Sequence, residues 1–148
     1  MVEYKNILVP IDFSPGSDFA LQHAKKLIDR NGCTVHLVHV VEPTTPPVGL
    51  GLGPEMYVGL EKDLSEASVR KLDNMCKDLN NQGYTTKNRS LKGKASTEIT
   101  DYASENDIDL IVINTHGASG IEHFLFGSTT EKVLRKAKCP VMVVRKKG

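Results

Sequence analysis

The stretch from Asn114 to Glu131 (NTHGASGIEHFLFGSTTE) combines glycines with small hydroxyl residues, a composition suited to holding an anion. Gly117 and Gly120 allow the loop to turn its amides inward, and Gly127 removes a side chain that would block close approach. Ser128-Thr129-Thr130 then opens a helix whose first amides lack partners within that helix. Together with the helix dipole, these amides favour a phosphate group.

The same residues support a second interpretation. Ser128 and Glu131 have the Ser-x-x-Glu spacing of a capping box, in which each side chain satisfies an amide at the start of one helix. If the box forms, Ser128 is occupied and the Glu131 carboxylate disfavours a phosphate nearby. Both interpretations remain open from this stretch alone.

Asp12 is the second candidate. It follows the apolar run Ile7–Ile11, in the segment Pro10-Ile11-Asp12-Phe13-Ser14. An aspartate at this place can form an Asx-turn before a helix that starts at Ser14-Pro15. It can equally contact a ribose hydroxyl or a metal ion, so the turn and the ligand interpretations both stand.

Other catalytic templates are missing from the sequence. There is no Gly-x-x-x-x-Gly-Lys-Ser/Thr loop and no Gly-x-Ser-x-Gly elbow. His116 and His123 lack a third metal ligand, and the three cysteines form no Cys-x-x-Cys pair. We therefore expect no catalytic residue and no metal site built from protein ligands alone.

The composition is that of one ordinary globular domain. The chain has 148 residues, 39% of them hydrophobic, and we expect a single domain over residues 1–148. Nineteen Lys and Arg against eighteen Asp and Glu leave a net charge of +1, which gives no electrostatic case for nucleic acid or an anionic membrane. No apolar run is long enough for a membrane span or signal sequence, and free cysteines fit a reducing compartment. We expect a cytoplasmic protein.

Strand-like and helix-like patterns alternate along the chain. The apolar runs predict strands over Ile7–Ile11, Val35–Val41, Tyr84–Leu91, Leu110–Ile113 and Val141–Val144, the third of them polar and at a sheet edge. Helices are predicted from Ser14-Pro15 to Asn31-Gly32, from Leu60 to near Gly83, around Ile99–Ala103 up to Asn106-Asp107, and from Ser128 through Ala137. Residues 42–57 are rich in proline and glycine and predict one long loop. Five strands alternating with four helices indicate an α/β fold with a parallel sheet.

The chain resembles the universal stress protein family over nearly its whole length. The matching segments are the opening KNILVPIDFS, HVVE after the second strand, and the closing CPVMVVR. The most specific match is Thr115-His116-Gly117, then nine residues, then Gly127-Ser128. The resemblance implies a Rossmann-like, doubly wound five-stranded parallel sheet of order 3-2-1-4-5. It also implies ATP binding, with Mg²⁺, in a stress-response or regulatory protein that hydrolyses ATP slowly at most.

The resemblance also implies roles for residues. Gly117, Gly127 and Ser128 would hold the phosphates, Asp12 would lie near the ribose or its metal, and the Val40 backbone would contact the adenine edge. The full set of expected nucleotide-binding residues is Pro10, Ile11, Asp12, Val40, Asn114, His116, Gly117, Gly120, Gly127, Ser128, Thr129 and Thr130.

Asn114 departs from the family pattern, which has glycine there. Asparagine tolerates a left-handed backbone better than most residues, so the turn could survive. Its side chain could crowd the ribose.

The resemblance also implies that the fifth strand lies at a sheet edge and that the protein is a homodimer. Val141, Met142, Val143 and Val144 would then form an apolar edge, and pairing with a second copy would cover it. Two alternatives to ATP binding remain: a dimeric interaction module of the same fold that binds no nucleotide, and a carrier of flavin or another nucleotide.

Overall fold

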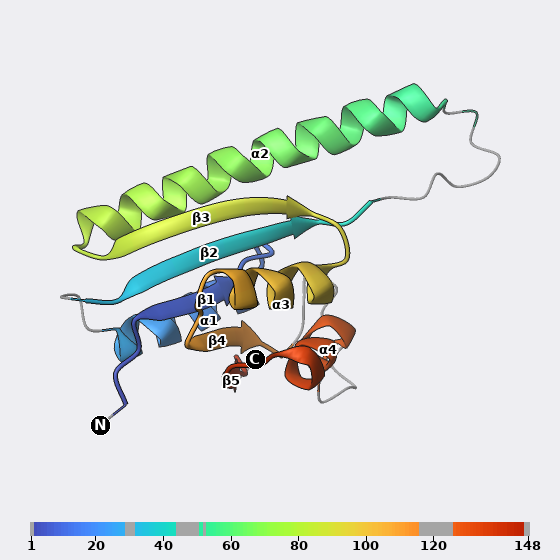
Figure 1. The fold of residues 1–148 in the computed structure, drawn as a ribbon. Coiled ribbons are helices and arrows are strands. Elements are labelled where there is room, and N and C mark those ends of the chain that lie inside the picture. The colour runs from blue at the N-terminus through green and yellow to red at the C-terminus, as the bar shows by residue number, and fades with distance from the viewer. Residues whose placement is uncertain (1, 29–31, 44–50, 52, 116–125, 147–148) are drawn as a thin grey trace.

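The computed structural model describes residues 2–28, 32–43, 51, 53–115 and 126–146. Its elements, in chain order, are β1 (Asn6–Pro10), α1 (Pro15–Leu27), β2 (Thr34–Val41), α2 (Pro54–Asn81), β3 (Thr85–Lys92), α3 (Ala95–Glu105), β4 (Leu110–Asn114), α4 (Ser128–Lys136) and β5 (Val141–Val144). The strands form one parallel sheet of order β3-β2-β1-β4-β5 (Figure 1). The predicted fold class and strand order are confirmed.

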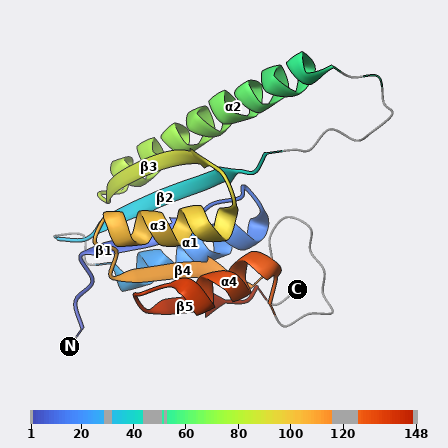
Figure 2. The ribbon, with the colours of Figure 1, turned by 45° about the vertical axis from the view of Figure 1, so that its right-hand side comes forward.

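The helices cover both faces of the sheet (Figure 2). Alternate strand residues such as Val9 and Leu37 pack with α1 and α2 on one face. Their neighbours Leu8 and Val38 pack with α3 and α4 on the other. This two-sided burial explains why the inner strands are continuous apolar runs rather than alternating ones.

The start of α1 follows its predicted signals, but its end does not. Ser14 is the N-cap, its side chain accepts a hydrogen bond from the Ser17 amide at 3.2 Å, and Pro15 is the first helical residue. The helix ends at Leu27, short of the predicted end at Asn31-Gly32. Ile28 is already extended and buried, so the chain leaves the helix to reach β2.

The predicted loop over residues 42–57 is too long at its C-terminal end. Pro54 begins α2 and Gly53 is its N-cap, so residues 54–57 are helical. Proline in a sequence often indicates a loop, but its fixed φ also suits the first turn of a helix. The first half of α2 extends past the sheet (Figures 1 and 2), which leaves Met56, Leu60 and Leu64 exposed. Residues 44–50 and 52 lie outside the described part of the chain.

The two sheet edges differ in character. β3 is one edge and is polar, as predicted, while β5 is the other and carries only apolar side chains. β1 and β4 are neighbours at the centre, so the segments that follow them lie beside each other. Within the described residues, no helix combines the length and hydropathy needed to cross a bilayer.

His36 on β2 anchors a buried polar network between β2 and α3. Its Nε2 donates to Asn6 Oδ1 at 3.1 Å, and its Nδ1 accepts from the Tyr102 hydroxyl at 2.8 Å. Burial, and secondarily the charge of Lys87, lowers the pKa of His36 to about 4. Burial also raises the pKa of Tyr102, so its hydroxyl keeps the proton that it donates. The imidazole is therefore neutral in the folded protein.

The network predicts acid sensitivity. In the unfolded chain, His36 is protonated as the pH falls below the ordinary histidine pKa of about 6.5. In the folded chain it stays neutral until the pH approaches about 4. Stability attributable to His36 is therefore intact above pH 6.5 and falls as pH drops towards 4. Between pH 7 and pH 5 the loss is about 2 kcal/mol.

Denaturant unfolding of wild type and His36→Gln at both pH values measures this loss. The variant is expected to lose about 2 kcal/mol less than wild type over the interval. His23→Gln, at a half-buried position on α1, is the control and is expected to follow wild type. Equal losses in wild type and His36→Gln would contradict the assignment.

Candidate functional site

A pocket of about 120 Å³ opens at the carboxyl ends of β1, β2 and β4, beneath the starts of α3 and α4. Its walls are mostly apolar, and we call this pocket the apolar slot. The apolar lining residues include Ile11, Val38, Val40, Ile99 and Ile113. The volume lies below the roughly 300–1,000 Å³ of sites that enclose a whole drug-sized ligand. A pocket of this volume suits a ring-sized group rather than a whole ligand of that kind.

The pocket brings together seven of the residues expected from sequence, namely Pro10, Ile11, Asp12, Val40, Asn114, Thr129 and Thr130. Gly127 and Ser128 lie immediately before Thr129, at the start of α4. His116, Gly117 and Gly120 fall outside the described residues. Two segments more than a hundred residues apart in sequence therefore face one pocket, as their places after β1 and β4 require.

Asp12 serves the turn and lines the pocket at the same time. Its Oδ1 accepts a hydrogen bond from the Ser14 amide at 2.9 Å and another from the Ser14 hydroxyl. Oδ2 accepts none from the residues that the structure describes. The Asx-turn is thus formed, and it does not exclude a ligand contact, because it uses one carboxylate oxygen.

The residue after Asp12 has an unusual backbone. Phe13 has φ of 61°, a left-handed conformation that is rare for a bulky side chain. Its ring packs on His39, whose Nδ1 donates to the Ile11 carbonyl at 2.7 Å. These contacts fix the chain direction on both sides of Asp12, so the carboxylate is held at the pocket.

Of the two interpretations of Ser128 and Glu131, the capping box does not form. Gly127 is the N-cap, with φ of −67° and ψ of 162°, and Ser128 is already the first helical residue. Glu131 pairs with Arg135 at 2.7 Å, and no bond joins Glu131 to Ser128 in the described chain. Glycine is itself an acceptable N-cap, so the helix needs no serine there.

The start of α4 is bonded to the end of β4. Thr130 Oγ1 donates to the Asn114 carbonyl at 2.8 Å, and the Gly127 amide donates to the Thr115 carbonyl at 2.6 Å. The first α-helical bond runs from the Glu131 amide to the Gly127 carbonyl at 3.0 Å. The amides of Ser128, Thr129 and Thr130 precede that bond, so they have no acceptor within the helix. Their donors suit an anion.

Asn114 is accommodated without a left-handed backbone. It is the last residue of β4 and is not among the described residues with positive φ. Its amide group lies over the start of α1, where a Cβ added to Gly16 would come within 2.6 Å of Asn114 Nδ2. The tolerance of asparagine for a positive φ is therefore not needed, and Gly16 supplies the room for the side chain.

Sequence reasoning missed the contribution of α3. Ala95 and Ile99 complete the pocket wall from the first turns of that helix. Ile99 was used only to locate the third predicted helix, and the small Ala95 after Gly93 is the signal that could have indicated close packing there. In the described chain no three His, Cys, Asp or Glu side chains gather where they could hold a metal ion.

Known proteins resemble this chain in sequence and in overall fold. The Universal stress protein MJ0577 of Methanocaldococcus jannaschii is 31% identical over 159 residues, covering 99% of this chain and 98% of that protein. The solved structure of MJ0577 matches with a TM-score of 0.89 at 33% identity over 99% of each chain. Universal stress protein A homolog 2 of Coxiella burnetii is 34% identical over 150 residues, 100% of this chain and 99% of that protein.

A more distant structure shares the fold. The crystal structure of a universal stress protein in complex with cAMP matches with a TM-score of 0.68 at 19% identity, over 97% of this chain and 98% of the other. The sequence model of the universal stress protein family matches residues 3–145. With its sheet order, its pocket and these relatives, the chain belongs to the universal stress protein family.

Proposed function

We propose that this universal stress protein binds ATP, with Mg²⁺, in the pocket between β1, β4 and the start of α4. The observation that carries the proposal is the junction of an apolar slot with three amides that have no acceptor within their helix, at Ser128, Thr129 and Thr130. An adenine ring needs the first feature and a polyphosphate the second.

Each part of the pocket has a role in this proposal. Pro10 and Ile11 form one wall, and the Val40 backbone contacts the adenine edge. Oδ2 of Asp12 accepts from a ribose hydroxyl or binds the metal ion. Gly127 gives the phosphates close access to the helix start. Asn114 lies at the base, and His116, Gly117 and Gly120 are proposed to complete the loop around the phosphates.

The fold is compatible with this ligand. One universal stress protein of the same fold was crystallised in complex with cAMP, and an Arabidopsis thaliana family member has AMP bound. These proteins are 19% and 16% identical to this chain, so they support the proposal through the fold alone.

The pocket offers little for catalysis. Asp12 is the one carboxylate in its described wall, and it is held in a turn rather than directed at an attacking water. No arginine lies in that wall to stabilise charge on a transferred phosphoryl group. We therefore propose a cytoplasmic stress-response or regulatory role in which ATP binding is the signal and hydrolysis is slow at most.

We also propose a homodimer through β5. Val141, Met142 and Val143 are half-buried in the single chain and lie on an open sheet edge. The Ile111 amide donates to the Pro140 carbonyl at 3.0 Å, and the Thr115 amide donates to the Val144 carbonyl at 3.1 Å. The backbone groups of the even-numbered residues in this strand therefore point towards β4. Val141 and Val143 therefore turn their backbone groups towards the free edge, where a second β5 can pair.

Asp12→Asn tests the nucleotide proposal. The asparagine oxygen can still accept from Ser14, so the turn is kept while the carboxylate is lost. Calorimetric titration with Mg-ATP is expected to show saturable binding to wild type and about tenfold weaker binding to the variant.

The matched control is Asp18→Asn, in the exposed first turn of α1, which is expected to bind as wild type does. Absence of heat from wild type at millimolar Mg-ATP would contradict the proposal. It would favour an interaction module that uses the fold without a nucleotide.

Val143→Pro tests the dimer. Proline removes the outward amide of residue 143 but leaves the ladder to β4 intact. Sedimentation of wild type is expected to give a dimer and that of the variant a monomer. Val143→Thr keeps the amide and is expected to remain dimeric. A monomeric wild type, or a dimer in all three proteins, would contradict pairing through β5.

A further inference from the structure

Phe13 connects the segment that follows β1 to helix α2. The residue does not line the apolar slot, and its ring packs on the core that α1 and α2 form with one face of the sheet. The Nζ atom of Lys71, on α2, lies 4.9 Å from the centre of the Phe13 ring. A residue next to Asp12 is therefore in contact with a helix that contributes nothing to the wall of the slot.

The backbone of Phe13 gives this contact its importance. A φ of 61° is strained for a bulky side chain, and such a conformation persists only where surrounding contacts hold it. Two contacts of the ring do so. The His39 ring lies against it with the ring centres 4.7 Å apart, and the Lys71 ammonium lies over it. A cation over an aromatic ring is attracted to it, so loss of the ammonium weakens the hold on Phe13.

The conformation of Phe13 determines the geometry of the Asp12 turn. Oδ1 of Asp12 accepts from the Ser14 amide at 2.9 Å, and this bond spans Phe13. Rotation about φ of Phe13 therefore changes the distance between the Asp12 carboxylate and the Ser14 amide. It also redirects Oδ2, the oxygen assigned above to a ribose hydroxyl or a metal ion.

Lys71 has no other role in the part of the chain that the structure describes. It is exposed, and none of the ion pairs formed there includes it. Its neighbour Leu72 is fully buried, so the helix is firmly seated on the sheet at this point. The ammonium group over Phe13 is therefore carried by a rigid part of α2.

We propose that Lys71 is a positioning residue for the nucleotide site, which holds the Phe13 ring and thereby fixes the direction of the Asp12 carboxylate. The inference rests on the proposed function, in which Asp12 contacts the nucleotide. The coupling is reciprocal: if the Lys71 contact strengthens ATP binding, ATP binding strengthens that contact by the same factor. Helix α2, whose first half extends past the sheet (Figure 1), thus registers whether the site is occupied.

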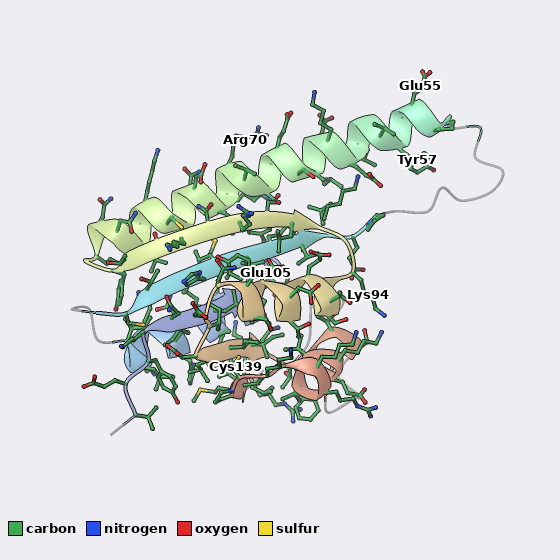
Figure 3. The ribbon with its side chains drawn as sticks, viewed as in Figure 1. Glu55, Tyr57, Arg70, Lys94, Glu105 and Cys139 are labelled. Carbon is green, nitrogen blue, oxygen red and sulfur yellow. The ribbon has the colours of Figure 1, made fainter. Side chains whose placement is uncertain are left out.

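The first test compares three variants of the full-length protein by calorimetric titration with Mg-ATP. Lys71→Met keeps a long side chain without the ammonium and is expected to bind two- to fivefold more weakly than wild type, roughly the effect of one exposed cation over a ring. Lys71→Arg keeps the cation and is expected to bind as wild type does. Arg70→Met is the matched control, because Figure 3 shows Arg70 on the side of α2 turned away from the sheet, and it is expected to bind as wild type does.

A double-mutant cycle identifies the route by which Lys71 acts. In a Phe13→Leu or an Asp12→Asn background, Lys71→Met is expected to cause little further loss of ATP affinity. A loss of the same size in all three backgrounds would overturn the proposal, because Lys71 would then act on the phosphates directly through its charge. An equal loss in Arg70→Met would overturn it for the same reason.

Hydrogen exchange of the Ser14 amide, measured without nucleotide, separates this inference from the nucleotide proposal. Because that amide donates to Asp12 across Phe13, it is expected to exchange two- to fivefold faster in Lys71→Met than in wild type, and at the wild-type rate in Arg70→Met. If wild type bound no ATP, faster exchange would still show that Lys71 sets the Asp12 turn. Unchanged exchange in Lys71→Met would overturn the inference whatever the affinity for ATP.

Discussion

The bonds between the end of β4 and the start of α4 are the constraint on which the proposed site depends. Thr130 Oγ1 donates to the Asn114 carbonyl, and the Gly127 amide donates to the Thr115 carbonyl. The Thr115 amide in turn donates to Val144 on β5. These bonds tie the start of α4 to the end of β4, next to the centre of the sheet. Thr129 and Thr130, in the first turn of that helix, are held at the wall of the apolar slot.

The sheet order places the start of α4, which those bonds hold, beside the segment that follows β1. β1 and β4 lie side by side although most of the chain separates them, and ligands of open α/β sheets bind where the strand order reverses. Asp12 and the start of α4 therefore face one another across the pocket. Thr129 divides the apolar slot from a larger, charged pocket. The start of α4 thus lines both the apolar slot and a wall that carries two lysine side chains.

Much of this fold could be predicted from sequence because the inner strands are buried on both faces and the helix starts carry local signals. Ser14-Pro15 placed the start of α1 correctly, whereas Pro54 was taken for loop because proline suits both a loop and a first helical turn. The role of Ser128 stayed open for a similar reason, since Gly127 and Ser128 are both acceptable N-caps. The contribution of Ala95 and Ile99 could not be predicted, because it depends on how α3 packs over the sheet.

The central claim is that the amides of Ser128, Thr129 and Thr130 are held ready for a polyphosphate. Titrating ¹⁵N-labelled protein with Mg-ATP and, separately, with adenosine tests it most directly. We expect ATP to shift these three amides strongly and saturably, and adenosine to shift residues of the apolar slot such as Val40 while leaving the three amides nearly unchanged. ATP-induced shifts that spare all three amides would contradict it.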